Sequence, residues 1–244
     1  MQPTGVPPTH IGHWMTSKAA TNGVIVSLVG NRIGPECLRN VLIHSPGHQH
    51  LVGVTPRADR RYVEDVLVSN GPQTVELFSA HEVLSQMSRG DVRPQWLLNL
   101  WGELIIPRKA LESCSSSVNV HPSLLPWARG SDPVVWSIAN GWPAGATLHE
   151  MTADVDAGPV WAQEEVPYGF DATGGELYLR VIDACLDLFR RSWPMILSGS
   201  LTPKPQGVGH VAARRRDLVE NRLINLDDSR NADKLNFIRM IQAY

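Results

Sequence analysis

The fold is decided first by a stretch that runs Val24-Ile25-Val26-Ser27-Leu28-Val29 and stops at Gly30. Almost every residue of this stretch is apolar, which is typical of a strand whose two faces are both covered, as in a parallel sheet. Pro35 then opens a predicted helix over 36–44, because the first turn of a helix needs no backbone N–H donor. The beginning of this region therefore indicates a strand that is followed by a helix.

The same alternation continues along the chain. Further strands are predicted over 51–54, 74–78, 96–101, 117–121, 146–151 and 160–166, and helical segments over 57–69, 80–88, 133–140 and 173–196. This pace predicts an α/β fold, with a Rossmann-like, mostly parallel sheet and helices on both faces. Asp132 is the expected N-cap of its helix. The last helix has a predicted core-facing stripe made of Leu177, Leu179, Val181, Ile182, Ala184, Cys185, Leu188 and Phe189.

The composition narrows the class of protein. The 244 residues are 43% hydrophobic, which is enough for a sizeable core, and the net charge of −2 provides no global positive field for nucleic acid or an anionic membrane. We see no secretory signal and no run that approaches the roughly 20 apolar residues of a membrane helix. The three widely spaced cysteines favour neither a disulfide framework nor a thiolate zinc site. We therefore expect a cytoplasmic protein.

Three regions are expected along the chain. Residues 1–22 are rich in Pro, Thr and Gly and predict a flexible N-terminal arm. Residues 23–198 hold all the predicted strands and form the main domain, and 199–244 is a more polar C-terminal extension. The turn over 30–35 has two glycines but lacks the G-x-G-x-x-G fingerprint. NAD binding is therefore not supported, and a plain tight turn is the simpler interpretation.

Two polar residues stand at the end of one predicted strand. Asn119 and His121 alternate, so their side chains share a face, and the prolines at 122 and 126 stop the strand just after them. Open α/β sheets place their sites at the carboxyl ends of strands. An amide can donate to an oxygen that becomes negative, and an imidazole can carry a proton. Asp156, in a turn after another strand, is a plausible carboxylate partner for the imidazole.

A longer pattern surrounds these residues. It runs Asn119-Val120-His121-Pro122-Ser123-Leu124-Leu125-Pro126, continues with Arg129-Gly130, and is followed by Asp154-Val155-Asp156-Ala157-Gly158-Pro159. This pattern closely resembles the signature of the formyltetrahydrofolate-dependent formyltransferases, which include glycinamide ribonucleotide formyltransferase, methionyl-tRNA formyltransferase and the sugar N-formyltransferases. Upstream, residues 101–107 resemble the family's loop around the pterin. The resemblance is strong over 96–162.

The resemblance implies a catalytic domain over 23–198, 10-formyltetrahydrofolate as the formyl donor, and no metal. Asn119 and His121 would stabilise the oxyanion, and Asp156 would position and charge His121. The donor would contact Trp101, Gly102, Glu103, Leu104, Ile105, Ile106, Asp154 and Val155. The acceptor substrate would contact Ser123, Arg215 and His149, although His149 could instead simply pack in the core.

The sequence also separates the members of this family. Pro35 removes a backbone donor that a phosphate-binding loop after the first strand would use, which argues against the purine-pathway enzyme. The short extension argues against methionyl-tRNA, and the start of the first strand near Val24 leaves no room for a hydrolase's regulatory domain. The sugar N-formyltransferases remain the most similar.

We therefore expect a nucleotide-linked amino sugar as the acceptor and a homodimer, with membranes and nucleic acid not involved. The run over 214–216, with Lys204, would meet a diphosphate or would be a solvated charged surface. The alternatives are a non-sugar amine, such as a natural-product intermediate or methionyl-tRNA, and a non-catalytic relative that binds folate.

Overall fold

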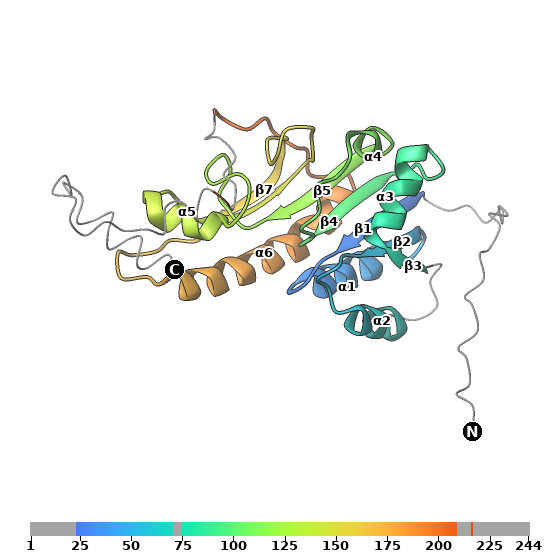
Figure 1. Cartoon of the computed structure of the whole chain (residues 1–244), viewed down its shortest axis with the longest axis horizontal. Coiled ribbons are helices and arrows are strands. Elements are labelled where there is room, and N and C mark those ends of the chain that lie inside the picture. Colours follow the sequence, from blue (N-terminus) through green and yellow to red (C-terminus); the bar gives the residue numbers. More distant parts are fainter. Residues whose placement is uncertain (1–22, 71–74, 209–215, 217–244) are drawn as a thin grey trace, which may run out of the picture.

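The computed structural model of the chain describes residues 23–70, 75–208 and 216, and within them a single sheet of seven strands carries the fold (Figure 1). The strand order is β3-β2-β1-β4-β5-β6-β7. The strands are β1 (Val24–Val29), β2 (Gln49–Val54), β3 (Val75–Ser79), β4 (Trp96–Leu100), β5 (Ser116–His121), β6 (Gly145–His149) and β7 (Val160–Glu165). The predicted α/β fold is confirmed.

One strand, β6, runs against all the others in the sheet. The five strands from β3 to β5 pair in parallel, whereas β6 is antiparallel to both β5 and β7. Parallel neighbours need a crossover connection, but an antiparallel pair needs only a loop. The β6–β7 connection is therefore a loop, and it returns the chain to the end of β6 at which His149 faces Asn119.

Helices cover both faces of the sheet, as predicted (Figure 1). They are α1 (Gly34–His44), α2 (Arg60–Ser69), α3 (Ala80–Arg89), α4 (Arg108–Glu112), α5 (Pro133–Asn140) and α6 (Gly174–Leu197). Residues of α1, α2, α5 and α6 belong to the larger buried apolar cluster, and residues of α3 and α4 belong to the smaller one on the other face. Val118 and Val120 of β5 face the larger cluster, so Asn119 and His121 point to the opposite side.

Gly30 allows two loops to approach each other closely at the carboxyl edge of the sheet. Its backbone N–H donates to the Leu100 carbonyl at 2.9 Å, and a Cβ atom at this position would lie only 1.7 Å from the Trp101 carbonyl oxygen. The glycine at the end of β1 therefore serves the packing of the loop that follows β4.

Two local details differ from the sequence pattern. Asp132 stands at the predicted N-cap position of α5, but its φ of 54° is left-handed and its side chain makes no capping hydrogen bond. The placement of Leu179 in the core stripe of α6 was wrong, because it is 59% exposed, while Leu177 and Val181 are fully buried. The helix lies on the sheet with a narrower face than the sequence pattern suggested, because Leu179 projects from its outer side.

Some expectations fall on residues that the structure does not describe. The N-terminal arm over 1–22 lies outside the described residues, as do Arg214 and Arg215 and most of the extension. The described beginning of the extension adds an isolated antiparallel bridge between Lys204 and Val160. Among the described residues, none of the helices combines the length and the apolar character that a membrane crossing requires. The division at residue 198 and the cytoplasmic location stay predictions.

The contrast between two leucines of α6 tests how this helix packs. Leu177→Ala should lower the free energy of unfolding by about 2–5 kcal/mol, because it leaves a cavity in the larger apolar cluster. Leu179→Ala should change it by less than about 0.5 kcal/mol, because the side chain is mostly in solvent. Urea denaturation followed by circular dichroism measures both. Equal losses for the two variants would contradict the observed orientation of α6.

Candidate active site

Asn119, His121 and Asp156 come together as the sequence predicted. Asn119 and His121 are 8% and 5% exposed at the carboxyl end of β5, and Asp156 reaches them from the β6–β7 loop. His121 Nδ1 lies 3.5 Å from Asp156 Oδ2, and Asn119 Nδ2 lies 3.3 Å from Asp156 Oδ1. Asn119 and His121 therefore both face the carboxylate of Asp156, whose side chain is 12% exposed.

The backbone helps to hold this carboxylate. Asp156 has a left-handed φ of 51°, and its Oδ2 accepts a hydrogen bond from the Gly130 backbone N–H at 2.8 Å. Gln206 Nε2 donates to the carbonyls of Asp156 and Gly158, at 3.0 and 2.6 Å, and its Oε1 accepts from Arg129 at 2.7 Å. The loop that carries Asp156 is thus fixed from both sides.

Burial decides the charge of the imidazole. It disfavours imidazolium and lowers the pKa of His121, and the nearby Asp156 carboxylate offsets this only in part. Burial alone would raise the pKa of Asp156, but His121 and the Gly130 N–H hold it well below its usual range. The geometry therefore favours an ionised Asp156 that positions His121. The predicted charging of His121 by Asp156 is not favoured, because burial outweighs the attraction.

Both ring nitrogens of His121 face acceptors. Nε2 lies 3.2 Å from the Ala128 carbonyl oxygen, and Nδ1 faces the Asp156 carboxylate. A neutral ring has one N–H donor, so it satisfies only one of these acceptors. If the ring takes up a second proton, the new N–H therefore already faces an acceptor, which is either the Ala128 carbonyl or the Asp156 carboxylate.

His149 joins this group more closely than the sequence indicated. It is 1% exposed, and its Nδ1 lies 2.7 Å from the Glu150 carbonyl oxygen, so this nitrogen carries the proton. Its Nε2 is then an acceptor, 2.9 Å from Asn119 Nδ2 and 3.4 Å from Asp156 Oδ1. Its ring meets that of His121 edge-on, with centroids 6.0 Å apart.

Asn99 of β4 is a polar residue of the site that sequence reasoning missed. It is 7% exposed and pairs in register with Asn119 on the neighbouring parallel strand. Its Nδ2 donates to Asn119 Oδ1 at 2.8 Å. The available signal was a lone amide in an otherwise apolar strand, at the register position beside Asn119.

A cavity of about 120 Å³ opens onto this group. Its apolar rim includes Ile105 and Val155, which are 87% and 49% exposed, and its polar floor includes Asn119 and Asp156. The full lining comprises Asn99, Leu104, Ile105, Ile106, Leu111, Asn119, His149, Met151, Thr152, Ala153, Val155 and Asp156. His121 is not part of the lining and lies beside Asp156 instead. An apolar rim above amide, imidazole and carboxylate groups suits a flat heterocycle with a polar reacting end.

Several predicted ligands do not line this cavity. The Trp101 ring packs against the larger apolar cluster, and the Glu103 carboxylate accepts from Thr55 Oγ1 at 3.0 Å and the Arg57 backbone N–H at 3.3 Å. Ser123 is 1% exposed, and its hydroxyl donates to the Trp127 carbonyl at 2.9 Å. Gly102 and Asp154 also lie outside the lining, and Arg215 lies outside the described residues. The binding roles of these six residues stay predictions.

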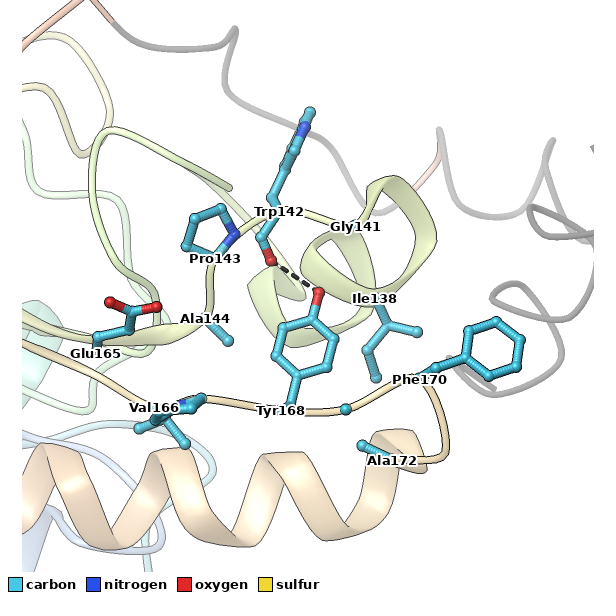
Figure 2. A pocket seen from close by; sticks show the side chains of 12 residues that line it. Ile138, Gly141, Trp142, Pro143, Ala144, Glu165, Val166, Tyr168, Phe170 and Ala172 are labelled. Carbon is cyan, nitrogen blue, oxygen red and sulfur yellow. Dashed lines mark hydrogen bonds between the residues drawn. The ribbon is translucent and has the colours of Figure 1, made fainter.

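A larger cavity, of about 370 Å³, lies elsewhere (Figure 2). It is bounded by the end of α5, by the segment that follows β7, and by Trp142, whose carbonyl accepts from the Tyr168 hydroxyl at 2.8 Å. Among the described residues that line it, Glu165 is the charged one. This cavity lies at the end of the β6–β7 pair where Gly145 faces Glu165, which is the end opposite to His149. This cavity is the larger of the two, but Asn119, His149 and Asp156 line the smaller one, which is therefore the candidate active site.

Metal ligands are not apparent in the part of the chain that the structure describes. Across residues 23–70, 75–208 and 216, no cluster of three or more histidine, cysteine, aspartate or glutamate side chains is arranged to hold an ion.

Comparison with known proteins finds a family model that matches the part of the chain holding this site. Residues 97–191 match the family model described as formyl transferase. This range contains Asn119, His121, His149 and Asp156. A methionyl-tRNA formyltransferase from Levilactobacillus brevis is 30% identical over 171 residues, which are 68% of this chain and 52% of that protein. Across the curated relatives compared, the matched part is 34–52% of the relative, so this chain spans about a third to a half of their length.

Solved structures extend the likeness of fold over most of the chain. A 4-N formyltransferase from Francisella tularensis superposes with a TM-score of 0.74 at 20% identity, covering 91% of this chain and 87% of that one. The N-formyltransferase from Helicobacter canadensis, solved with folinic acid and dTDP-3-aminofucose, has a TM-score of 0.69 at 18% identity and covers 90% and 79%. At such identities the likeness is one of fold.

The low pKa of Asp156 makes the free energy of unfolding depend on pH. The native pKa lies well below that of an unfolded aspartate, about 4, so the stabilisation is complete above that pH and is lost as pH falls toward the native pKa. The wild type should therefore lose stability relative to Asp156→Asn between about pH 5 and about pH 3. Urea titrations at both pH values measure this, with Asp91→Asn at an exposed carboxylate as the control. A difference that stays constant with pH would refute it.

Proposed function

We propose that this chain is an N-formyltransferase that moves a formyl group from 10-formyltetrahydrofolate to a primary amine. The observation that carries the proposal is the cavity whose apolar rim stands above Asn119, His149 and Asp156. The match of residues 97–191 to the formyl transferase family supports it. The folate would supply a formyl group on a nitrogen that can leave. The chain would supply the donor to the formyl oxygen and the groups that move protons.

Asn119 would supply the principal donor to the formyl oxygen. Its Nδ2 makes two contacts, at 2.9 Å to His149 and at 3.3 Å to Asp156, and the longer one is the easier to exchange for a new acceptor. When the amine nitrogen attacks, the formyl oxygen becomes negative, and a donor fixed beside it is worth roughly 3 kcal/mol. Asn119 is therefore assigned to the oxyanion.

Asp156 and His121 would manage protons. The amine must lose one proton, and the departing folate nitrogen must gain one. Asp156 lines the cavity as a carboxylate and can accept a proton through a water, while His121 stands behind it with acceptors at both ring nitrogens. His121 acts in this scheme through Asp156, because it does not line the cavity itself.

The acceptor amine that we propose is that of a nucleotide-linked amino sugar. The Helicobacter canadensis relative was solved with such a molecule, and the Francisella tularensis relative is named a 4-N formyltransferase. Arg215 remains a proposed contact for the diphosphate. Methionyl-tRNA is the second candidate, because the curated relatives at 30–38% identity are named methionyl-tRNA formyltransferases.

A formyl-transfer assay separates these candidates. The protein is incubated with 10-formyltetrahydrofolate and either a panel of nucleotide-linked amino sugars or methionyl-tRNA, with release of tetrahydrofolate and product mass both followed. One added formyl group on a sugar establishes the class and the acceptor. Transfer to methionyl-tRNA alone replaces the sugar. Folate binding with no transfer to either would favour a different amine or a non-catalytic relative.

Removal of the proposed donor or of the imidazole should slow turnover with the fold retained. Asn119→Ala and His121→Ala should each lower kcat at least about 10²-fold, which corresponds to the loss of one oxyanion donor or of the proton-carrying partner. Circular dichroism checks the fold of each variant. Near-normal turnover in either variant would remove that residue from its assigned role.

The apolar rim gives a test of donor binding that does not depend on the acceptor. Ile105→Asp should weaken the binding of 5-formyltetrahydrofolate about 10-fold, a loss of about 1.4 kcal/mol, because a charge replaces an apolar contact. Isothermal titration calorimetry measures the Kd. Val68→Asp is the matched control, since Val68 is 83% exposed on α2 and outside the lining of the cavity. Equal Kd values for the two variants would exclude Ile105 from donor binding.

A further inference from the structure

We infer that Asn99 is a positioning residue that fixes which end of the Asn119 amide faces the cavity, and that it ties this choice to the loop after β4. The inference rests on the proposed function for its catalytic meaning. Its structural content stands on hydrogen bonds alone.

The orientation of both amides follows from the backbone of Gly102. The Gly102 N–H is an obligatory donor and lies 3.1 Å from one end of the Asn99 side chain, so that end is Oδ1. The other end is therefore Nδ2, which donates to the Gly102 carbonyl at 3.2 Å and to Asn119 at 2.8 Å. The Asn119 atom that receives this bond must be Oδ1. Asn119 Nδ2 is then left to face His149 and Asp156.

The opposite orientation of Asn119 is unfavourable as long as Asn99 is present. It would set Asn119 Nδ2 against Asn99 Nδ2, and it would set Asn119 Oδ1 against the Asp156 carboxylate and the unprotonated Nε2 of His149. Each of these contacts joins two donors or two acceptors inside a buried site, where an unsatisfied polar group is costly. Asn99 thus makes the donor end of Asn119 the end that meets the formyl oxygen.

Close packing connects this choice to the loop that follows β4. Asn99 Oδ1 reaches so near to Gly102 that a Cβ atom there would lie 2.2 Å from it. Two residues further on in this loop, Leu104 begins the apolar wall of the cavity. The loop that lines the donor site and the amide that receives the formyl oxygen are therefore held by one side chain.

The substitution Asn99→Asp tests the inference directly. A carboxylate at this position has no donor end, so Asn119 should turn to donate its Nδ2 to the introduced carboxylate, leaving Oδ1 toward His149. His149 Nε2 would then gain a proton to meet that oxygen. In the wild type, long-range ¹H–¹⁵N spectra of ¹⁵N-histidine-labelled protein should show His149 Nε2 unprotonated, and in Asn99→Asp they should show it protonated. This readout needs neither folate nor an acceptor.

A double variant separates the effect of the turned Asn119 amide from the effect of the negative charge that Asn99→Asp introduces. In Asn99→Asp combined with Asn119→Ala, the Nε2 signal should return to its wild-type position, because the turning amide is gone. Persistence of the protonated signal in the double variant, or an unchanged signal in Asn99→Asp, would overturn the inference. Gly102→Ala provides a second route, since the added methyl group displaces Asn99 Oδ1 without adding charge, and it should broaden or shift the same signal.

Kinetics supply the functional half of the test. Asn99→Ala should lower kcat about 10-fold with KM for the donor changed less than about 2-fold, because the Asn119 amide loses the partner that holds its Oδ1 end while the apolar rim is kept. Asn70→Ala is the control, since it removes an amide that donates to the Val66 carbonyl at 2.6 Å, remote from the site. If wild type transfers no formyl group but the His149 signal responds as described, the proposed function fails and the positioning role stands. If transfer occurs and the His149 signal does not respond, the proposed function stands and the positioning role of Asn99 fails.

Discussion

The carboxylate of Asp156 is the interaction around which the site is assembled. Four groups lie around it: the His121 ring, the Asn119 amide and the Gly130 N–H, which can donate to it, and the His149 ring, whose Nε2 lies 3.4 Å away. They come from β5, from β6 and from the loop before α5. A carboxylate that is 12% exposed on its side chain requires such partners, because burial of an unpaired charge is expensive. Three chain segments therefore have to meet at this carboxylate. Because β6 runs antiparallel to β5, the β6–β7 loop that carries Asp156 starts beside the carboxyl end of β5.

Much of this arrangement could be predicted from the order of residues. The apolar run of β1 and the prolines after His121 depend on local rules, since strand burial and the lack of a backbone donor are visible without tertiary contacts. The pairing of Asn119 with His121 on one face followed from simple alternation. Leu179 was misjudged because a helix pattern gives a stripe but not its width. Asp132 was placed correctly, but a capping pattern gives a position and not the φ that the chain adopts there.

Depth and neighbours could not be predicted in the same way. Alternation places His121 on the correct face of β5 but does not show that it lies beside Asp156 and away from the cavity lining. Asn99 is an ordinary strand amide until parallel pairing sets it beside Asn119. The sequence resemblance likewise pointed to residues 101–106 as one binding loop, whereas Trp101 and Glu103 pack inward or toward Thr55 and the loop contributes its apolar half from Leu104 onward.

The tight approach of Asn99 to Gly102 also restricts how this protein can change over time. A Cβ atom at position 102 would lie 2.2 Å from Asn99 Oδ1, so any side chain there requires the amide of Asn99 to move. A gain of side-chain bulk at position 102 is therefore easier to accommodate once the residue at position 99 has become smaller. We expect the effects of substitutions at the two positions to depend on each other, so that the order in which they arise matters.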